Sequence, residues 1–513
     1  MINMKKSSVI LIVVFLLTID LFAKNYYVAV TGSDTNAGTS VSLPYASVTK
    51  AVSVMIAGDT IFLRGGTYTL NSRINISKSG TSTSKFYMFA YTGDSRPILD
   101  FSGMAIGSSN QGVLLSSASY WYIKGIKIKG AGDNGMQING GGNNIIEFCD
   151  FFDNRDAGLQ LKNGTVNNRI INCDAYYNAD YVSGSTTYTG GNADGFAPKL
   201  DIGSGNYFYG CRSWLNSDDG WDGLLYSDCN ISTTLVNCWT WKNGYLKDGT
   251  TTTSDMNGNG FKMGGGWITD ANSVKHYTFR HNMTLNNCLA FENKGKGFDQ
   301  NHNYGSMVIY NGTAYNNGNY NFYLGDTVAA SCSVTLKNNL YYAGSKSYSV
   351  STKNTIVSTT NCWNIRSATA ADFVSVDTTG ISGPRQDDGS LPVVTFMHLK
   401  PTDSFIDAGT NVGLSFNGTA PDLGCFETSP VSAVSNAVEN TINIYPNPVN
   451  DEFRITNITG LSKMSIFDLN GQILLSQMVY NKEAVSISSF SKGLYIVRIV
   501  SDNHLFQTKI VKN

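Results

Sequence analysis

The sequence predicts an all-β protein, a parallel β-helix with a short N-terminal capping helix, followed by a small C-terminal β-sandwich domain. The 513 residues are rich in glycine (52), tyrosine (28) and phenylalanine (25) but include only 10 prolines, which is typical of β-structure with many tight turns. Side chains recur at regular intervals through the middle of the chain, and short alternating strands follow residue 441. A net charge of −1 gives no field that would favour nucleic acid or an anionic membrane.

Residues 1–23 are predicted to be a secretory signal peptide. Lys5 and Lys6 precede an apolar core from Val9 to Ile19, and Ala23 is a small residue suited to cleavage. The apolar run is too short to span a bilayer, which disfavours the alternative of a membrane anchor. We therefore expect the protein to leave the cytoplasm.

The mature chain should begin with a strand and a capping helix. Tyr26 to Val30 alternate as a strand does. Between Pro44 and Ala57, apolar residues are spaced as one face of a helix, at Val48, Ala51, Val52, Met55 and Ile56. Such a helix would cover the open end of a stack of β-coils.

Internal repeats follow, aligned on five cysteines whose position is taken by glycine and asparagine in two later copies. The copies are separated by 24, 38, 27, 50, 24 and 27 residues, and their positions are Cys149, Cys173, Cys211, Cys238, Cys288, Gly312 and Asn339. Three residues later each copy has an aromatic residue, at Phe152, Tyr176, Trp214, Trp241, Phe291, Tyr315 and Tyr342. Five residues later every copy except that with Gly344 has an asparagine, at Asn154, Asn178, Asn216, Asn243, Asn293 and Asn317.

One coil per repeat would stack these side chains at the ~4.8 Å separation of neighbouring strands. We expect apolar and aromatic residues to fill the interior, with Trp214 and Trp241 in a core. Cysteines would act as small buried hydrophobes, and the asparagine amides would form a ladder. Disulfides along the cysteine column stay possible but strained, because neighbouring Cα atoms lie at the short end of the usual range.

The end of the chain changes character. Residues 366–430 are predicted to be a last coil and closing segment, 431–440 a linker, and 441–513 a small β-sandwich. Three runs resemble the C-terminal sorting domain of type IX secretion cargo, namely Ile444-Tyr445-Pro446-Asn447-Pro448, Asp468-Leu469-Asn470-Gly471 and Gly493-Leu494-Tyr495. The resemblance implies export across an outer membrane. A carbohydrate-binding module is the alternative for this domain.

Ionisable residues gather where each coil returns to a glycine followed by an apolar residue. Asp194 and Asp219 precede that glycine in successive copies, and Asp222 and Lys262 follow it by two residues. We therefore expect two pairs of stacked neighbours, with Asp218 beside them. Insertions at residues 181–192 and 245–258 should form loops beside this patch, as is common at functional sites.

Four carboxylates so close together cannot all stay ionised without a cation. Oxygen ligands without clustered histidine or cysteine favour Ca²⁺. Lys262 beside the metal should have a lowered pKa and act as a general base that removes the proton α to a carboxylate. The alternative is that each Asp-Gly pair only caps a turn.

Further residues could contact a sugar. Trp267, after three glycines, is expected to stack on substrate, and Lys296 and Asp299 lie one coil beyond Lys262. The five histidines show no ligand spacing.

At these residues the chain resembles polysaccharide lyase family 9. The segments that carry the resemblance are Asp194 to Lys199, Asn216 to Asp222 and Gly258 to Gly265. It implies a right-handed parallel β-helix over residues 24–430, with calcium held by Asp194, Asp218, Asp219 and Asp222, and Lys262 as the base.

The implied substrate is an acidic plant cell-wall polysaccharide, most simply polygalacturonate, with rhamnogalacturonan as the alternative. Besides this polymer and the type IX machinery we expect no nucleic-acid partner, and a monomer. A β-helix glycoside hydrolase would instead use two carboxylates about 5–10 Å apart, which gives Lys262 no role. A surface adhesin would use calcium for stability alone.

Overall fold

The computed structural model describes residues 23–180, 189–227, 229–352, 355–428, 443–458, 462–468, 473–501 and 504–513. Nearly all of the predicted signal peptide and the whole predicted linker lie outside these ranges. Within them, no helix is both long and apolar enough to cross a membrane. The chain divides into two compact units, Met1–Pro430 and Val431–Asn513.

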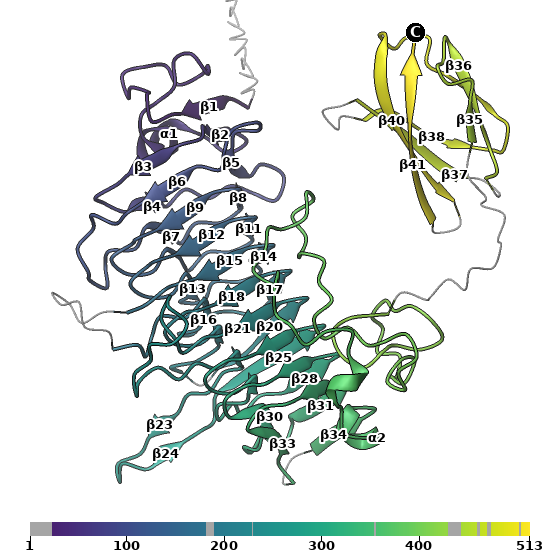
Figure 1. Cartoon of the computed structure of the whole chain (residues 1–513). Helices are drawn as coiled ribbons and strands as arrows, with labels where there is room; N and C mark the ends of the chain where they lie inside the picture. Colours follow the sequence, from purple (N-terminus) through teal and green to yellow (C-terminus); the bar gives the residue numbers. More distant parts are fainter. Residues whose placement is uncertain are drawn as a thin grey trace, which may run out of the picture. The chain divides into compact units, whose positions relative to one another are not determined.

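The first unit is a stack of β-coils, in which each complete coil contributes one strand to each of three parallel sheets (Figure 1). The first sheet contains β1 (Asn25–Val28), β2 (Thr60–Leu63), β5 (Phe86–Ala90), β8 (Trp121–Lys124), β11 (Ile145–Glu147), β14 (Arg169–Ile171), β17 (Asn206–Tyr209), β20 (Asn230–Val236), β25 (Arg280–Asn286), β28 (Met307–Tyr310), β31 (Ser333–Lys337) and β34 (Thr355–Thr359). The second sheet contains β4 (Ile74–Ile76), β7 (Val113–Ser116), β10 (Met136–Asn139), β13 (Leu159–Lys162), β16 (Phe196–Pro198), β19 (Trp221–Asp222), β22 (Phe261–Lys262), β27 (Phe298–Asp299), β30 (Tyr320–Leu324) and β33 (Lys346–Val350). The third sheet contains β3 (Thr67–Thr69), β6 (Ile98–Asp100), β9 (Lys127–Lys129), β12 (Asp150–Phe152), β15 (Asp174–Tyr176), β18 (Arg212–Trp214), β21 (Trp239–Trp241), β26 (Leu289–Phe291), β29 (Thr313–Tyr315) and β32 (Leu340–Tyr342).

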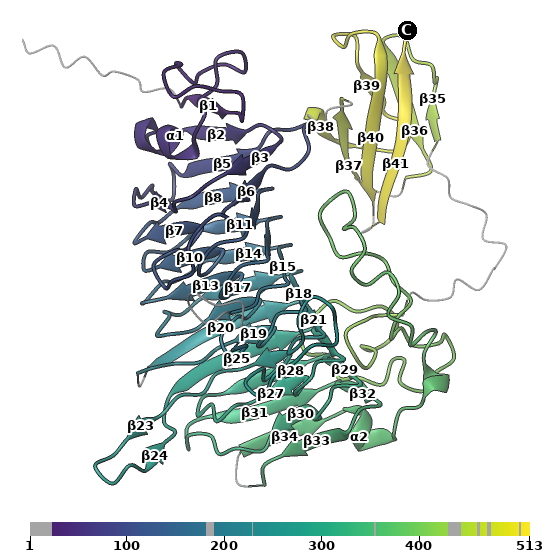
Figure 2. The same ribbon diagram turned by 60° about the vertical axis from the view of Figure 1, so that its left-hand side comes forward.

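The capping helix is α1 (Val48–Val54), which lies against β1, β2 and β4 at the N-terminal end of the stack (Figure 2). Ser47 caps it by accepting a hydrogen bond from the Lys50 backbone N–H at 3.1 Å. Val48, Ala51 and Val52 are buried, as the predicted helix face requires. Ile56 is 39% exposed because the helix ends before it.

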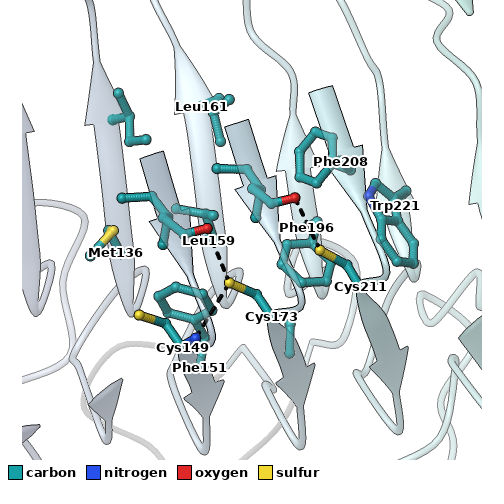
Figure 3. Packing of buried hydrophobic residues seen from close by; sticks show 14 of the residues in the cluster. Met136, Cys149, Phe151, Leu159, Leu161, Cys173, Phe196, Phe208, Cys211 and Trp221 are labelled. Carbon is teal, nitrogen blue, oxygen red and sulfur yellow. Dashed lines mark hydrogen bonds between the residues drawn. The ribbon is translucent and has the colours of Figure 1, made fainter. Parts of the chain in front are cut away.

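The predicted cysteine column is confirmed in the coil interior (Figure 3). Cys149, Cys173 and Cys211 are fully buried among apolar side chains, and all nine cysteines are free thiols. Opposite them, Phe196 and Trp221 stack with ring centroids 4.8 Å apart. The thiols therefore act as small hydrophobes.

The predicted asparagine ladder is also confirmed, since each buried amide Nδ2 donates to the Oδ1 of the asparagine in the next coil. The distances are 2.9 Å for Asn154 to Asn178, 2.8 Å for Asn178 to Asn216, 2.9 Å for Asn216 to Asn243, 2.9 Å for Asn243 to Asn293 and 3.0 Å for Asn293 to Asn317. Where Gly344 interrupts the column, Asn317 donates instead to Asn321 Oδ1 at 2.9 Å. The ladder satisfies amides that would otherwise be buried without partners.

The aromatic column lies on the other side of the third sheet, so the prediction that it fills the coil interior is wrong. Each aromatic residue is the third after an inward cysteine, and side chains alternate along a strand, so the two point to opposite sides. Trp214 and Trp241 stack at 4.8 Å and belong to a second hydrophobic cluster outside the coil. The prediction that Trp214 and Trp241 lie in a core is therefore confirmed, but the core is this second cluster and not the coil interior.

Residues 366–428 cover this second cluster, so they do not form the predicted last coil. They follow α2 (Cys362–Ile365), and their only helix or strand is the short 3₁₀ helix η1 (Ala370–Asp372). Phe373, Phe396 and Phe405 from this segment pack over the aromatic column. Arg385 Nη2 lies 2.5 Å from Asp174 Oδ1 on β15, which ties the segment to a much earlier coil.

The second unit confirms the predicted small β-sandwich. One antiparallel sheet contains β35 (Asn443–Tyr445), β36 (Glu452–Thr456) and β39 (Ala484–Ser486), and the other contains β37 (Ser462–Phe467), β38 (Ile473–Val479), β40 (Gly493–Ser501) and β41 (His504–Lys512). Phe453, Ile466 and Val497 are fully buried in one core that both sheets share.

Candidate active site

The second sheet brings the predicted site residues together. Its register pairs Asp222 with Lys262 and Phe196 with Trp221. Asp194 and Asp219 each precede these paired aromatics by two residues and so lie in neighbouring coils, as predicted. Because the aromatic side chains point into the coil, alternation places Asp222 and Lys262 on its outer surface.

Three carboxylates form an acidic cluster that we define as Asp194, Asp219 and Asp222. One oxygen from each lies within 4.8 Å of the others, and all three side chains are buried. Lys262 Nζ lies 3.0 Å from Asp219 Oδ2 and 3.4 Å from Asp222 Oδ1. The coil register therefore assembles the carboxylates and the amine that the sequence singled out.

A second lysine in the acidic cluster, Lys199, was not among the predicted site residues. Its Nζ lies 2.6 Å from Asp194 Oδ2 and 3.2 Å from Asp222 Oδ2. Alternation offered a signal, because Lys199 follows Ala197 by two residues and shares its face. Ala197 stands in the same column as Asp222, and its small side chain leaves room for the lysine to reach the carboxylates.

Asp218 lies beside the acidic cluster but is not one of its three grouped carboxylates. It is only 1% exposed, and its Oδ1 accepts a hydrogen bond from the Asn257 backbone N–H at 3.2 Å. Asn257 belongs to the insertion at 245–258, so this loop covers the aspartate. Thr253 Oγ1 donates to Thr189 O at 3.0 Å, which joins the two insertions, although residues 181–188 lie outside the described residues.

Burial and the two lysines set the charges of the site. Burial raises the pKa of Asp194 well above its usual value, raises that of Asp219, and raises that of Asp218 to about 8. Burial also acts to raise the pKa of Asp222, but Lys262 and Lys199 outweigh it and hold that pKa below its usual value.

The protein's own charges oppose the expected lowering of the Lys262 pKa. Burial would lower it, but Asp219 and Asp222 raise it well above its usual value. The expected lowering relied on the positive charge of a metal ion. Without such a charge, the amine is protonated.

The site fits a hard divalent cation such as calcium. Its donors are carboxylate oxygens, and the four aspartates, once ionised, would carry two more charges than the two lysines. Asp219 Oδ2 is buried without a hydrogen bond, because Lys262 lies at ion-pair distance but outside hydrogen-bond geometry. An oxygen in this state is suited to a metal.

The remaining predicted residues lie farther along the sheet. Asp299 is paired with Lys262 in register, and its Oδ1 is 2.9 Å from Lys296 Nζ. Trp267 is 41% exposed and precedes a hairpin formed by β23 (Ile268–Thr269) and β24 (Lys275–His276). Lys275 Nζ lies 3.9 Å from the centre of the Trp267 ring.

His281 supports the turn after Asp222, a role that the sequence did not indicate. Its Nδ1 lies 2.9 Å from Gly223 O and its Nε2 2.7 Å from Thr233 Oγ1. Burial lowers the pKa of His281 to about 4, so the ring is neutral and holds the backbone next to the acidic cluster.

The fold and the site together define a polysaccharide lyase of the parallel β-helix class. Residues 26–339 match the family model of the Pel9A-like, right-handed β-helix region. The chain belongs to this family. Residues 443–513 match the secretion system C-terminal sorting domain, which favours that identity over a carbohydrate-binding module.

Individual lyases are similar to this chain in sequence and in structure. The chain is 37% identical over 418 residues to pectate lyase L of Dickeya chrysanthemi, covering 78% of this chain and 90% of the relative. It is similar to the crystal structure of pectate lyase Pel9A, with a TM-score of 0.68 and 34% identity over 79% of this chain and 96% of the other. A rhamnogalacturonan lyase structure gives a TM-score of 0.64 and 27% identity, over 74% of this chain and 97% of the other.

Proposed function

We propose that this chain is a calcium-dependent lyase that cleaves pectic polymers, polygalacturonate first, by β-elimination. The observation that carries the proposal is the buried acidic cluster with Lys262 against it on the second sheet. The pectate lyases among its relatives support the same substrate class.

Asp194, Asp219 and Asp222 would hold the calcium ion, with Asp218 as the fourth carboxylate beside them. When bound, calcium would offset the negative charge of these groups and polarise the carboxylate of a uronate. Lys199 stays paired with Asp194 and keeps that carboxylate oriented.

Lys262 is the proposed base. Its side chain is 12% exposed, so the Nζ can meet a substrate on the outer surface of the sheet. The amine takes the proton from C5 of a uronate, and the electron pair of that C–H bond forms the C4–C5 double bond. The glycosidic oxygen leaves C4 with its electron pair and is protonated by solvent. Because Asp219 and Asp222 raise the pKa of Lys262, the amine is neutral only when a cation offsets their charge, which makes activity depend on that cation.

A rhamnogalacturonan lyase with the same mechanism is the second candidate, supported by the similarity to a solved rhamnogalacturonan lyase. A glycoside hydrolase would leave Lys262 without a role, and an adhesin would cleave nothing.

The assay that separates these candidates follows ultraviolet absorbance of the unsaturated product with polygalacturonate and with rhamnogalacturonan, with and without chelator. We expect absorbance with polygalacturonate that chelation abolishes and calcium restores. Reducing ends without absorbance would mean hydrolysis. The absence of both signals with both polymers would contradict a lyase.

Lys262→Ala and Lys262→Arg test the base directly. Arginine keeps the charge but cannot lose its proton at working pH, so both variants should lose activity by at least ~10³-fold. Titration calorimetry should show that both variants still bind calcium, more tightly with alanine than with arginine, because only arginine keeps a positive charge beside Asp219 and Asp222. Full activity in either variant would remove Lys262 from the mechanism.

For export we propose residues 1–23 as the signal peptide, 24–430 as the catalytic domain, 431–440 as the linker and 441–513 as the domain read by type IX secretion machinery. The sorting-domain match supports the last assignment. We propose that the exported protein acts as a monomer on plant cell-wall polysaccharide, either free or at the cell surface.

A further inference from the structure

A cavity of about 760 Å³ lies along the same wall as Lys262, toward the C-terminal coils. The second sheet pairs Lys262 with Asp299, Asp299 with Tyr323, and Tyr323 with Ser349. The lining residues His302, Asp326 and Thr352 each follow one of the last three partners by three residues. From the ~3.3 Å rise per residue and ~4.8 Å strand separation, the cavity lies on the order of 10 Å from Lys262.

The β23–β24 hairpin forms the other wall of this cavity and projects from the stack of coils (Figure 2). It contributes Lys275 and His276, and Tyr277 follows it. The Tyr277 ring stacks on His302 with centroids 4.3 Å apart. Lys275 is exposed and reaches over Trp267. One wall therefore presents aromatic rings together with an exposed amine.

The two walls are held in place by hydrogen bonds. The His302 backbone N–H donates to Asp326 Oδ2 at 2.9 Å, and Gln300 Nε2 donates to Asp326 O at 3.0 Å. At the foot of the hairpin, Asn301 Nδ2 donates to Gly264 O at 2.7 Å. The cavity is thus preformed, and its volume is within the usual range for small-ligand sites.

One coil beyond Lys262 lies a third amine. Lys296 Nζ is 2.9 Å from Asp299 Oδ1 and 4.3 Å from the centre of the Tyr323 ring. The wall therefore presents amines interleaved with aromatic rings, at Lys262, Lys296 and Lys275. Such a surface suits a polysaccharide that has carboxylates along one edge and C–H faces on its sugar rings.

We propose that this cavity is a subsite for a further uronate of the same acidic polymer, which stacks a sugar face on Tyr277 and pairs its carboxylate with Lys275. The inference rests on the proposed function. It adds the path that the polysaccharide takes beyond the sugar ring that reacts. It makes binding depend on substrate length and on free carboxylates.

The test measures binding by calorimetry in calcium, with the full chain carrying Lys262→Ala so that nothing is cleaved. Galacturonate oligomers of increasing length are titrated against this parent, and then against the parent with Lys275→Ala or Tyr277→Ala. We expect each added change to weaken binding of long oligomers about tenfold, equivalent to ~1.4 kcal/mol, and to weaken binding of the dimer much less. Methyl-esterified long oligomers should lose the Lys275 effect but keep the Tyr277 effect.

Lys50→Ala is the matched control, because Lys50 Nζ lies 5.9 Å from the Tyr45 ring beside the capping helix, far along the stack from Lys275. It should leave binding of every oligomer unchanged. An equal loss at all lengths, or no loss from Lys275→Ala and Tyr277→Ala, would overturn the subsite while leaving the lyase intact. A parent that binds calcium but no galacturonate oligomer would overturn the proposed substrate and the subsite with it.

Discussion

Lys199 and Lys262 share the charge of the acidic cluster unequally. Asp222 lies between them, 3.2 Å from Lys199 and 3.4 Å from Lys262, and it is the one carboxylate of the acidic cluster whose pKa is lowered. Lys199 is the more enclosed of the two, at 7% exposure against 12%. We therefore propose that Lys199 orients carboxylates and that Lys262 meets the substrate.

Lys199→Met should destabilise the calcium-free protein by about 3–5 kcal/mol, because it leaves buried carboxylates without their partner. Added calcium should recover more stability in this variant than in the wild type. The matched control is Lys242→Met, whose exposed pair with Glu292 at 3.6 Å is worth at most about 1 kcal/mol. Urea unfolding in chelator and in calcium measures both, and equal losses in the two variants would contradict the role of Lys199.

Calcium affinity should rise with pH up to about 8. The folded pKa of Asp218 is about 8 against an ordinary value of 3.8, so below 8 this carboxyl holds a proton that calcium must displace. For the same reason the folded chelated protein loses this group's stabilisation as pH rises from about 4 to 8, since only the unfolded chain has released the proton. Calorimetry between pH 6 and 9 in buffers of different ionisation enthalpy measures affinity and proton release. Constant affinity without proton release would contradict the burial of Asp218.

At the scale of elements, the asparagine ladder keeps successive coils in register beneath the site. Asn243 Nδ2 donates to Asn293 at 2.9 Å, and its Oδ1 accepts from Asn216 at 2.9 Å. The Asn243 amide therefore links the coil of Lys262 to the coil of Asp219 and Asp222 on one side and to the coil of Asn293 on the other.

Asn243→Ala should cost about 2–4 kcal/mol, because it leaves neighbouring buried amides unsatisfied. Asn139→Ala removes a comparable but exposed hydrogen bond, in which Asn163 Nδ2 donates to Asn139 Oδ1 at 2.6 Å, and should change stability by less than about 0.5 kcal/mol. Thermal unfolding compares the two variants. A similar small shift in both would mean that the ladder does not hold the register.

Features that repeat once per coil could be predicted from sequence, and features formed by distant segments could not. The asparagine column and the pairing of Asp222 with Lys262 follow from one register. The covering of Trp214 and Trp241 depends on residues 366–428, which have no period. Lys199 was missed because its partners are set by side-chain reach across a neighbouring coil.

At the scale of the whole molecule, the coiled first unit provides a rigid frame for chemistry, and the second unit matches a domain that directs secretion. All site residues come from the first unit, on neighbouring coils of one sheet. A single scaffold thus explains the acidic cluster, the two lysines and the cavity beyond them. The central claim is that the register of successive coils places the carboxylates of the acidic cluster around one metal ion.

The most direct measurement is a crystal structure of the Lys262→Ala protein soaked with calcium and a galacturonate oligomer. We predict one calcium ion in contact with Asp194, Asp219 and Asp222, and a uronate whose C5 faces the position of the missing amine. Calcium bound away from these aspartates, or an oligomer bound elsewhere on the coil, would contradict the account.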